Sequence, residues 1–257
     1  MRWPEADALR ADVAVTTRIG GVSDGPYASL NLGFHVGDDP DRVRLNRTRA
    51  AEAFGVDLGS MVFAQQVHGV HHELVGPEHH GMGTSTLEDA VPSTDILVTT
   101  SVSTTIVVLV ADCVPLALID PDARVLAVVH AGWRGTAAGA VGHAVRAMAE
   151  CGARPERMWA FVGPAVHPSR YQVDADVLSG LSAAVAPEAL PSEVAVADGT
   201  GGWLVDLIAA NRQQLLLAGV AAGRMTISGA STADAEFFSH RAARPCGRFA
   251  LMARLRD

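Results

Sequence analysis

The chain has 257 residues, with 28 acidic and 20 basic side chains and a formal net charge of −8 at pH 7. This balance argues against a general nucleic-acid-binding protein, which needs a basic surface. All 20 basic residues are arginine, so Schiff-base chemistry and a Walker-type phosphate lysine are excluded, and anions must be held by arginine or by backbone amides.

The first part of the chain predicts one strand, one long loop and one helix. Residues 11–18 alternate between apolar and polar side chains, which is typical of a strand. The turn-rich residues 20–37 form a connection long enough to suggest a functional loop. Residues 38–55 then predict a helix that is capped by Asp38 or Asp39 and ends at a glycine.

The centre of the chain predicts buried strands. Residues 60–76 indicate one or two strands, and residues 76–94 indicate a second long loop. Short β-branched runs follow, and runs that are apolar on both faces are typical of central strands. These runs cover residues 95–100, 105–113, 115–120 and 125–132.

The last part of the chain alternates between helices and strands. Helices are predicted at residues 135–152, 174–186 and 203–220, and strands at residues 158–164, 224–229 and 248–255. We expect a single α/β domain over residues 1–257, with a mixed β-sheet core and peripheral helices.

Cysteine usage and the N-terminal residues indicate the compartment. Three cysteines, an odd and sparse set, do not predict a disulfide framework. Residues 1–13 lack an apolar signal core, and no run approaches the roughly 20 apolar residues that span a bilayer. We expect a cytoplasmic protein with no membrane partner, acting as a monomer or a small homo-oligomer.

Three residues that can bind a metal stand at predicted strand ends: His68, Cys113 and His130. Each is followed within two residues by glycine or proline, where a side chain can face a pocket instead of the core. One thiolate and two imidazoles suit a zinc or copper site with an open fourth position. The spacing matches no zinc-finger pattern, so a buried thiol beside two hydrogen-bonded histidines is the alternative interpretation.

Several motifs of the chain resemble the signatures of a known protein family. The stretches "QQVHG", "ADCVPLALID" and "HAGWRGTAAG" resemble signatures of the YfiH family, also called the laccase-domain, multicopper-polyphenol-oxidase-like or peptidoglycan editing factor family. "TTRIGGVSDGPYASLNLGFHVGDDPDRVRLNR", "FVGPAVHPSRYQVD" and "FFSHRAARPCGRFALMARL" resemble its other signatures. The resemblance therefore covers nearly the whole chain.

The resemblance implies a zinc site at His68, Cys113 and His130 and an α/β fold similar to that of deamidase toxins. It also implies purine nucleoside chemistry, namely phosphorolysis of adenosine, inosine, guanosine and methylthioadenosine, or hydrolytic deamination of adenosine. Ser169 and Ser231 stand near positions where family members commonly carry cysteine, so a second thiol cluster that binds copper is not expected.

Candidate substrate-binding residues lie within or beside the resembling motifs. Because the chain has no lysine, phosphate needs arginine forks, and the candidates are Arg18, Arg47 and Arg134. Asn31 and His35, in the long N-terminal loop, are candidates for contacts with the sugar or the base. The expected partners are a purine nucleoside and phosphate.

Catalytic roles remain open at the sequence level. Asp112 is a candidate proton carrier for deamination, although it also fits a residue that orients a ligand or caps a strand. Cys113 and His130 fit a cysteine hydrolase as well as a metal site. A copper polyphenol oxidase is disfavoured because the chain has no His-x-His element, and a non-catalytic zinc protein with a cell-wall editing role is a further alternative.

Overall fold

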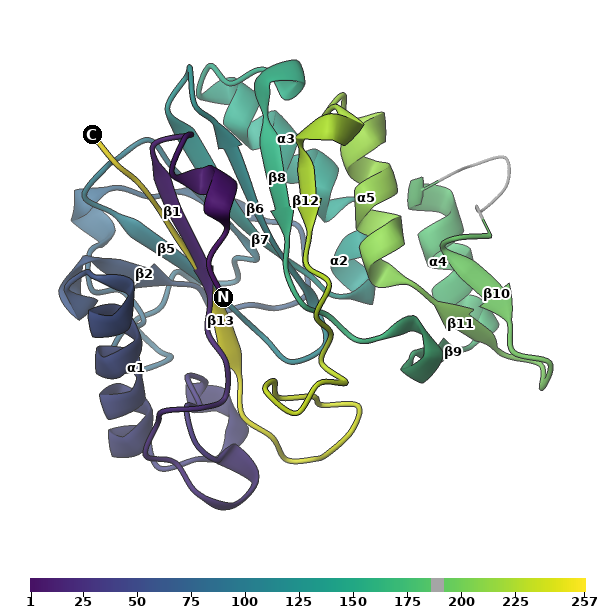
Figure 1. Cartoon of the computed structure of the whole chain (residues 1–257), viewed down its shortest axis with the longest axis horizontal. Coiled ribbons are helices and arrows are strands. Elements are labelled where there is room, and N and C mark those ends of the chain that lie inside the picture. Colours follow the sequence, from purple (N-terminus) through teal and green to yellow (C-terminus); the bar gives the residue numbers. More distant parts are fainter. Residues whose placement is uncertain (186–191) are drawn as a thin grey trace.

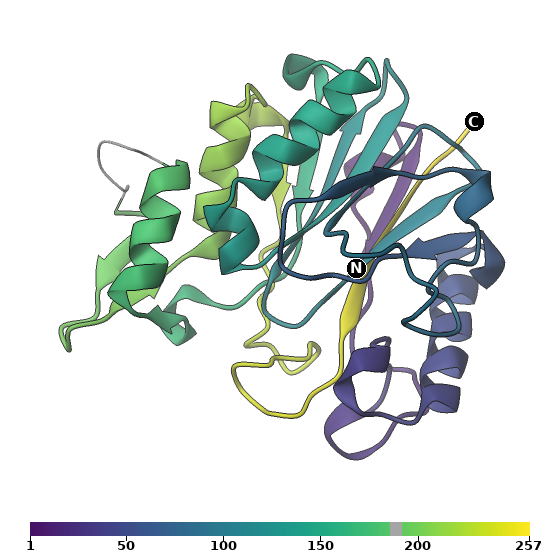
Figure 2. The same ribbon diagram turned by 180° about the vertical axis from the view of Figure 1, so that it is seen from behind.

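The computed structural model describes residues 1–185 and 192–257. Two β-sheets form its centre, and helices cover their outer faces (Figures 1 and 2). The first sheet has the strand order β1-β13-β5-β2, and the second has the order β12-β8-β6-β7-β4-β3. The strands of the first sheet are β1 (Ala11–Val15), β2 (Met61–Phe63), β5 (Thr105–Val110) and β13 (Phe249–Leu255). The strands of the second are β3 (His72–Leu74), β4 (Ile96–Thr99), β6 (Val114–Asp120), β7 (Val125–Ala131), β8 (Trp159–Val162) and β12 (Met225–Ile227).

The main core lies between the two sheets. Alternate side chains of a strand point to opposite faces, so Val108 of β5 packs inward against the second sheet while Leu109 packs outward. Ala117 of β6 and Val128 of β7 belong to the same inner core as Val108. Every residue of β5, β6 and β7 is buried, which is why these runs are apolar on both faces.

Helices complete the two outer layers. The four-stranded sheet is covered by α1 (Pro40–Phe54), where Asp39 accepts a hydrogen bond from Asp41 N–H and Gly55 ends the helix with φ +89°. The six-stranded sheet is covered on its outer side by the remaining helices. These are α2 (Trp133–Ala137), α3 (Ala140–Glu150), α4 (Ala175–Val185) and α5 (Leu207–Leu217).

Smaller elements lie at the periphery. A three-stranded sheet in the order β10-β11-β9 packs near α4. Its strands are β9 (Gln172–Val173), β10 (Ala195–Ala197) and β11 (Trp203–Val205). Short 3-10 helices occur at Pro4–Ala6, Gly25–Tyr27, Phe34–Val36, Leu58–Ser60, Pro77–His79, Pro155–Arg157, Pro168–Arg170 and Ala222–Arg224.

The mixed α/β fold class is confirmed, but two predicted helices are corrected. The helix predicted at 135–152 is broken at Gly139, whose φ of +78° no helix allows, so α2 and α3 form. The helix predicted at 203–220 begins as strand β11, and Asp206 caps α5 by accepting from Ala209 N–H. Ala186, the last residue of the helix predicted at 174–186, lies outside the described residues.

Strand boundaries also differ from the predictions. Residues 60–76 form two separate strands, β2 and β3, which belong to different sheets. The run at 105–113 ends as a strand at Val110, because the chain must leave the first sheet there to reach the second. In the part of the chain that the structure describes, no helix is both long enough and apolar enough to cross a membrane.

Candidate metal centre

The candidate site lies where two links cross from one sheet to the other. The link from β2 to β3 carries His68, and the link from β5 to β6 carries Cys113. Strands β2 and β5 are parallel neighbours, so their carboxyl ends reach the same edge of the sheet. His68 and Cys113 therefore meet although 45 residues separate them.

The register of β6 and β7 brings in the third residue. Pro115 is paired with His130, and β6 begins directly after Cys113, so the imidazole comes to lie beside the thiol. One ligand atom from each of His68, Cys113 and His130 lies within 4.8 Å of the others. The rings of His68 and His130 meet edge to face, with their centroids 4.7 Å apart. The structure thus brings the three sequence-predicted ligands together, although only His130 lies within a strand.

Asp95 supports both histidines, and it was not among the site residues predicted from the sequence. Its fully buried carboxylate accepts from His130 Nδ1 at 2.7 Å and from the N–H groups of Val67, His68 and Gly69 at 3.2, 3.0 and 2.7 Å. The bond to Nδ1 leaves His130 Nε2 as the free ring nitrogen, as in many histidine ligands. An acidic residue as the first residue of the buried run "DILVTT" was the available signal, because such a carboxylate must be paired.

Asp95 also explains how His68 keeps an unusual backbone conformation. His68 has φ +63°, in the left-handed region that non-glycine residues seldom adopt. The three consecutive N–H groups that converge on Asp95 hold that turn in place. Burial raises the pKa of Asp95, but the hydrogen bond and charge of His130 and the backbone N–H groups outweigh burial and lower it.

The electrostatics of the cluster favour a deprotonated sulfur. Burial raises the pKa of the Cys113 thiol, but the imidazoles of His130 and His68 outweigh burial and lower it. Burial lowers the pKa of His130, whereas the Cys113 sulfur and Asp95 raise it by a larger amount. A metal requires the thiolate form of cysteine, so this environment suits a metal ligand.

The shape of the site also fits a metal ion. A Cβ atom on Gly132 would lie 2.9 Å from Cys113 Sγ and 2.9 Å from His68 Cδ2, so only glycine leaves room for this ligand arrangement. Among the described residues, no fourth histidine, cysteine or carboxylate joins the group. One sulfur and two nitrogens with an open position match a catalytic type of zinc site and suit zinc better than magnesium or calcium.

A cavity of about 610 Å³ opens beside the three ligands. Trp133, Tyr171 and Leu207 give it an aromatic and apolar wall. Burial and the negative charge of Cys113 raise the pKa of Tyr171 to about 12, so its hydroxyl stays protonated and can donate a hydrogen bond at neutral pH. Tyr171 was not predicted from the sequence, although it lies within "FVGPAVHPSRYQVD", one of the stretches that resemble family signatures.

Three of the five predicted substrate-binding residues line this cavity: His35, Arg47 and Arg134. His35 lines the cavity and is partly exposed to solvent. Partial burial of its ring and the positive charges of Arg248 and Arg47 lower its pKa to about 4. Arg134 is exposed, and its guanidinium carbon lies 4.4 Å from the centroid of the Trp133 ring. His35 is therefore neutral at neutral pH, whereas Arg134 is a cation beside the aromatic wall.

Arg47 is buried, and its guanidinium group already donates hydrogen bonds to backbone carbonyls of the protein. Its Nε and Nη2 donate to Leu32 O at 2.9 and 2.6 Å, and its Nη1 donates to Gly83 O. The rings of Phe34 and Phe63 lie 4.3 and 4.0 Å from its guanidinium carbon. Burial lowers the pKa of Arg47 to about 9.

Arg18 and Asn31 do not line the cavity. Arg18 Nε donates to Ala28 O at 2.7 Å, and its guanidinium lies 4.6 Å from the Phe238 ring. Asn31 is fully buried; its Nδ2 donates to Asp38 at 2.9 Å, and its Oδ1 accepts from Arg248 N–H at 2.8 Å. Both residues shape the N-terminal loop.

Asp112 faces the C-terminal loop with both carboxylate oxygens occupied. Oδ1 accepts from the hydroxyls of Thr232 and Ser239 at 2.5 and 2.7 Å, and Oδ2 accepts from Arg241 N–H at 2.6 Å. Its φ of +96° belongs to the sharp corner between β5 and β6. This geometry fits a residue that positions a loop.

Known proteins resemble this chain over nearly its full length. The family model described as "Multi-copper polyphenol oxidoreductase laccase" matches residues 12–256. "Purine nucleoside phosphorylase YlmD" of Geobacillus stearothermophilus is 39% identical over 235 residues, which is 90% of this chain and 85% of that protein. A purine nucleoside phosphorylase of Corynebacterium glutamicum is 40% identical over 238 residues, 91% of this chain and 89% of its own length.

Two crystal structures show the same fold. That of YlmD from Geobacillus stearothermophilus has a TM-score of 0.94 at 37% identity and covers 99% of this chain and 94% of its own. That of the hypothetical protein YfiH from Bacillus licheniformis has a TM-score of 0.90 at 31% identity, with 96% and 93% covered. The chain therefore belongs to the multi-copper polyphenol oxidoreductase laccase family, the YfiH family that its sequence motifs resemble.

Proposed function

We propose that the protein is a metal-dependent purine nucleoside phosphorylase with zinc at His68, Cys113 and His130. The observation that carries this proposal is the open-sided set of one thiol and two imidazoles in the wall of a cavity of about 610 Å³. Relatives that are 39–40% identical over most of their length bear the name purine nucleoside phosphorylase, which supports the choice of substrate.

The proposed reaction exchanges one bond at the ribose. A phosphate oxygen forms a bond to C1′ while the bond between C1′ and the purine nitrogen breaks. The bonding electron pair leaves with the purine, and the proton of HPO₄²⁻ ends on the base. The products are ribose 1-phosphate and the free purine.

Each wall of the cavity has a task in this proposal. When bound, zinc supplies a positive charge and an open coordination position. Asp95 holds His130 in the ring orientation that a ligand needs. Trp133 and Tyr171 provide aromatic surface for the purine, and neutral His35 can donate and accept hydrogen bonds with the sugar.

Deamination of adenosine is a weaker proposal for this geometry. It needs a group that passes a proton to the leaving amine, and Asp112 was the sequence-level candidate. Both oxygens of Asp112 already accept hydrogen bonds from Thr232, Ser239 and Arg241, so we propose that Asp112 positions the loop.

A cysteine hydrolase is the second candidate, and a specific contact favours it. Asp95 orients His130 as the third member of a nucleophile triad would, with Cys113 as the nucleophile. The second imidazole, His68, has no role in such a triad, whereas it completes a metal site. A copper oxidase and a non-catalytic zinc protein with a cell-wall role rank below both, because three ligands beside a cavity suit a catalytic zinc ion.

The three cysteines support a reducing compartment. Cys113, Cys151 and Cys246 are all free thiols in the structure, as is usual in the cytoplasm. We therefore propose that the enzyme is cytoplasmic.

The test incubates the purified protein with inosine or adenosine, with and without inorganic phosphate. We expect ribose 1-phosphate and free base only when phosphate is present. Inosine formed from adenosine without phosphate would support deamination instead. A chelator should abolish turnover; turnover that survives or rises after metal removal would support the cysteine hydrolase.

Matched cysteine variants locate the metal. Cys113→Ala should lose both bound zinc and turnover, measured by metal analysis and product formation. Cys151→Ala should keep both, because Cys151 is also a half-buried thiol but lies outside the cavity. Equal metal content in the two variants would contradict the proposed site.

A further inference from the structure

The cavity is strongly basic although the chain as a whole is acidic. Five arginines line it, whereas Asp112 is the one carboxylate among the described lining residues. The five are Arg47, Arg134, Arg241, Arg244 and Arg248. The chain has a net charge of −8, so this concentration of positive charge in one hollow indicates an anionic ligand.

Two of the five arginines use their guanidinium groups for hydrogen bonds within the protein. Arg47 is buried between two phenylalanine rings and donates to carbonyl oxygens. Arg248 Nη1 donates to Cys246 O and Gly247 O, both at 3.0 Å. These contacts use their guanidinium groups to hold neighbouring loops, so a ligand finds fewer free donors on them.

The other three arginines keep most of their donors free. Arg241 Nη2 donates to Gln172 O at 3.2 Å, and Arg244 Nε donates to His240 O at 3.1 Å, so each uses one of the five N–H donors of a guanidinium. Within residues 1–185 and 192–257, no carboxylate forms an ion pair with Arg134, Arg241 or Arg244.

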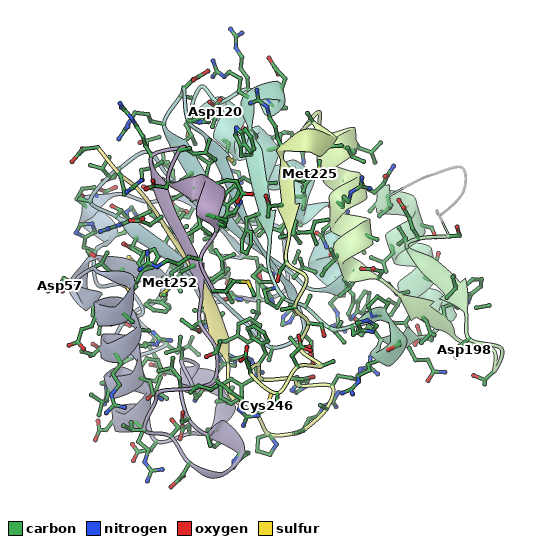
Figure 3. The ribbon with its side chains drawn as sticks, in the orientation of Figure 1. Asp57, Asp120, Asp198, Met225, Cys246 and Met252 are labelled. Carbon is green, nitrogen blue, oxygen red and sulfur yellow. The ribbon has the colours of Figure 1, made fainter. Side chains whose placement is uncertain are left out.

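Arg241 and Arg244 come from one segment, which we call the arginine loop (residues 228–248). It connects β12 to β13 and lies in yellow at the lower edge of the sheets in Figure 1, where Figure 3 labels Cys246. Asp112 fixes it through Thr232, Ser239 and the N–H of Arg241. Because Asp112 precedes Cys113, the loop is tied to the corner that carries one of the three candidate metal ligands.

We infer that Arg241, Arg244 and Arg134, which line the same cavity, form the binding site for inorganic phosphate. This inference rests on the proposed phosphorylase function and names the residues that hold its second substrate. Planar guanidinium groups bind tetrahedral oxyanions through paired N–H donors, and a chain without lysine has no other strong cation for the task. Tyr171 steadies one of them, because its ring lies 5.0 Å from the Arg241 guanidinium carbon.

The proposed reaction sets the order of the reacting groups. With phosphate at these arginines, C1′ of the ribose lies next to a phosphate oxygen, and the purine lies on the opposite side of C1′ as the leaving group. A phosphate group also occurs at the 5′ position of a nucleotide, so the experiment compares inorganic phosphate with adenosine 5′-monophosphate.

The test uses the full-length, metal-loaded protein and the variants Arg241→Met, Arg244→Met and their combination. Methionine keeps an unbranched, flexible side chain but removes the charge and the N–H donors of the guanidinium. Calorimetry with inorganic phosphate alone measures binding without turnover, and steady-state kinetics give KM for phosphate and for inosine. Arg146→Met is the matched control, because Arg146 is an exposed arginine of α3 that does not line this cavity.

We expect the double variant to bind phosphate about 10- to 100-fold more weakly, with KM for phosphate rising in parallel. KM for inosine and the bound zinc should stay at the wild-type values, and Arg146→Met should resemble the wild type throughout. Unchanged phosphate affinity in the double variant would overturn the inference. So would weaker binding of adenosine 5′-monophosphate with an unchanged affinity for inorganic phosphate.

The two proposals fail in different ways. If the wild type binds phosphate through these arginines but forms no ribose 1-phosphate, the phosphate site is supported and the phosphorylase proposal is wrong. If the wild type and the double variant form ribose 1-phosphate with equal KM for phosphate, the phosphorylase proposal is supported and this phosphate site is wrong.

Discussion

Two walls of the cavity are built in different ways. The ligand wall, formed by His68, Cys113 and His130, is set by strand register and by the buried carboxylate of Asp95. The arginine loop, which also lines the cavity, contains no helix or strand. Asp112, next to Cys113, joins this loop to the ligand wall by accepting three hydrogen bonds from it.

This difference indicates that the ligand wall is the more rigid part of the cavity and the arginine loop the less rigid part. Metal ligation tolerates small errors in distance poorly. His130 lies in a strand packed on both faces, and Cys113 directly precedes another. Asp95 holds the turn at His68, and together these supports provide that precision. Binding of a charged co-substrate tolerates more movement and requires access from solvent. We therefore expect changes in the ligand wall to abolish function and changes in the arginine loop to weaken it by degrees.

The largest effect is expected for Asp95→Asn, which tests the ligand wall. An amide cannot accept from His130 Nδ1 and from three backbone N–H groups as a carboxylate does. We expect zinc affinity to fall by about 10- to 100-fold, measured by competition with a chromophoric chelator. Asp176→Asn, at an exposed position in the first turn of α4, should bind zinc as the wild type does. Wild-type zinc affinity in Asp95→Asn would remove the distinction between the two walls.

A smaller effect is expected from a change at Asp120, the last residue of β6, at the end of this strand that lies away from the metal ligands (Figure 3). Asp120 is fully buried and accepts from Arg157 Nη2 and Arg154 N–H, both at 2.8 Å. Burial raises its pKa, but hydrogen bonds from the N–H groups of Arg154 and Ala123 and from Arg157 outweigh burial and lower it. Asp120→Asn should cost about 2 kcal/mol of unfolding free energy at pH 7.

The pH dependence gives this prediction its sign. A carboxyl whose pKa is lowered by folding stabilises the protein above its unfolded pKa of about 4 and loses that contribution as pH falls through the folded value. Urea unfolding should therefore separate the wild type from Asp120→Asn at pH 7 and bring them together as the solution is acidified below pH 4. Zinc and phosphate affinities at pH 7 should not change. A stability difference that is the same at every pH would contradict the assignment.

The smallest effect is expected for Ser239→Ala, which loosens the arginine loop. It removes one hydroxyl from Asp112 Oδ1, while Thr232 keeps the other. One hydrogen bond is worth about 1 kcal/mol, so phosphate affinity should fall by about fivefold with zinc retained. Hydrogen exchange at the Arg241 amide, which donates to Asp112, should become faster. Ser182→Ala, which removes a local hydroxyl bond in α4, is the control.

Loss of zinc in Ser239→Ala, or unchanged exchange at the Arg241 amide, would contradict the separation of the two walls. In the first case, the loop would be part of the metal-binding structure. In the second case, Asp112 would not be what fixes the loop.

Local features of the chain were readable from the sequence. The two ends of α1 were predicted from Asp39 and Gly55, because an N-cap side chain and a left-handed glycine each act within one turn of the helix. The apolar runs that became β6 and β7 were recognised because strands buried on both faces need no alternation. The three candidate ligands were recognised from residue type and from the chain breaks after them, and the family resemblance strengthened that prediction.

What the tertiary structure alone decided is how distant groups meet. The bond between Asp95 and His130 joins residues 35 positions apart, and the bond between Ser239 and Asp112 joins residues 127 positions apart. Sheet register and the two crossings between sheets produce these contacts, and no local pattern encodes them. The sequence by itself therefore determined which chemical groups the protein has and where its elements form. Their pairing across the sheets decided which groups share a cavity, because that pairing depends on the packing of the whole core.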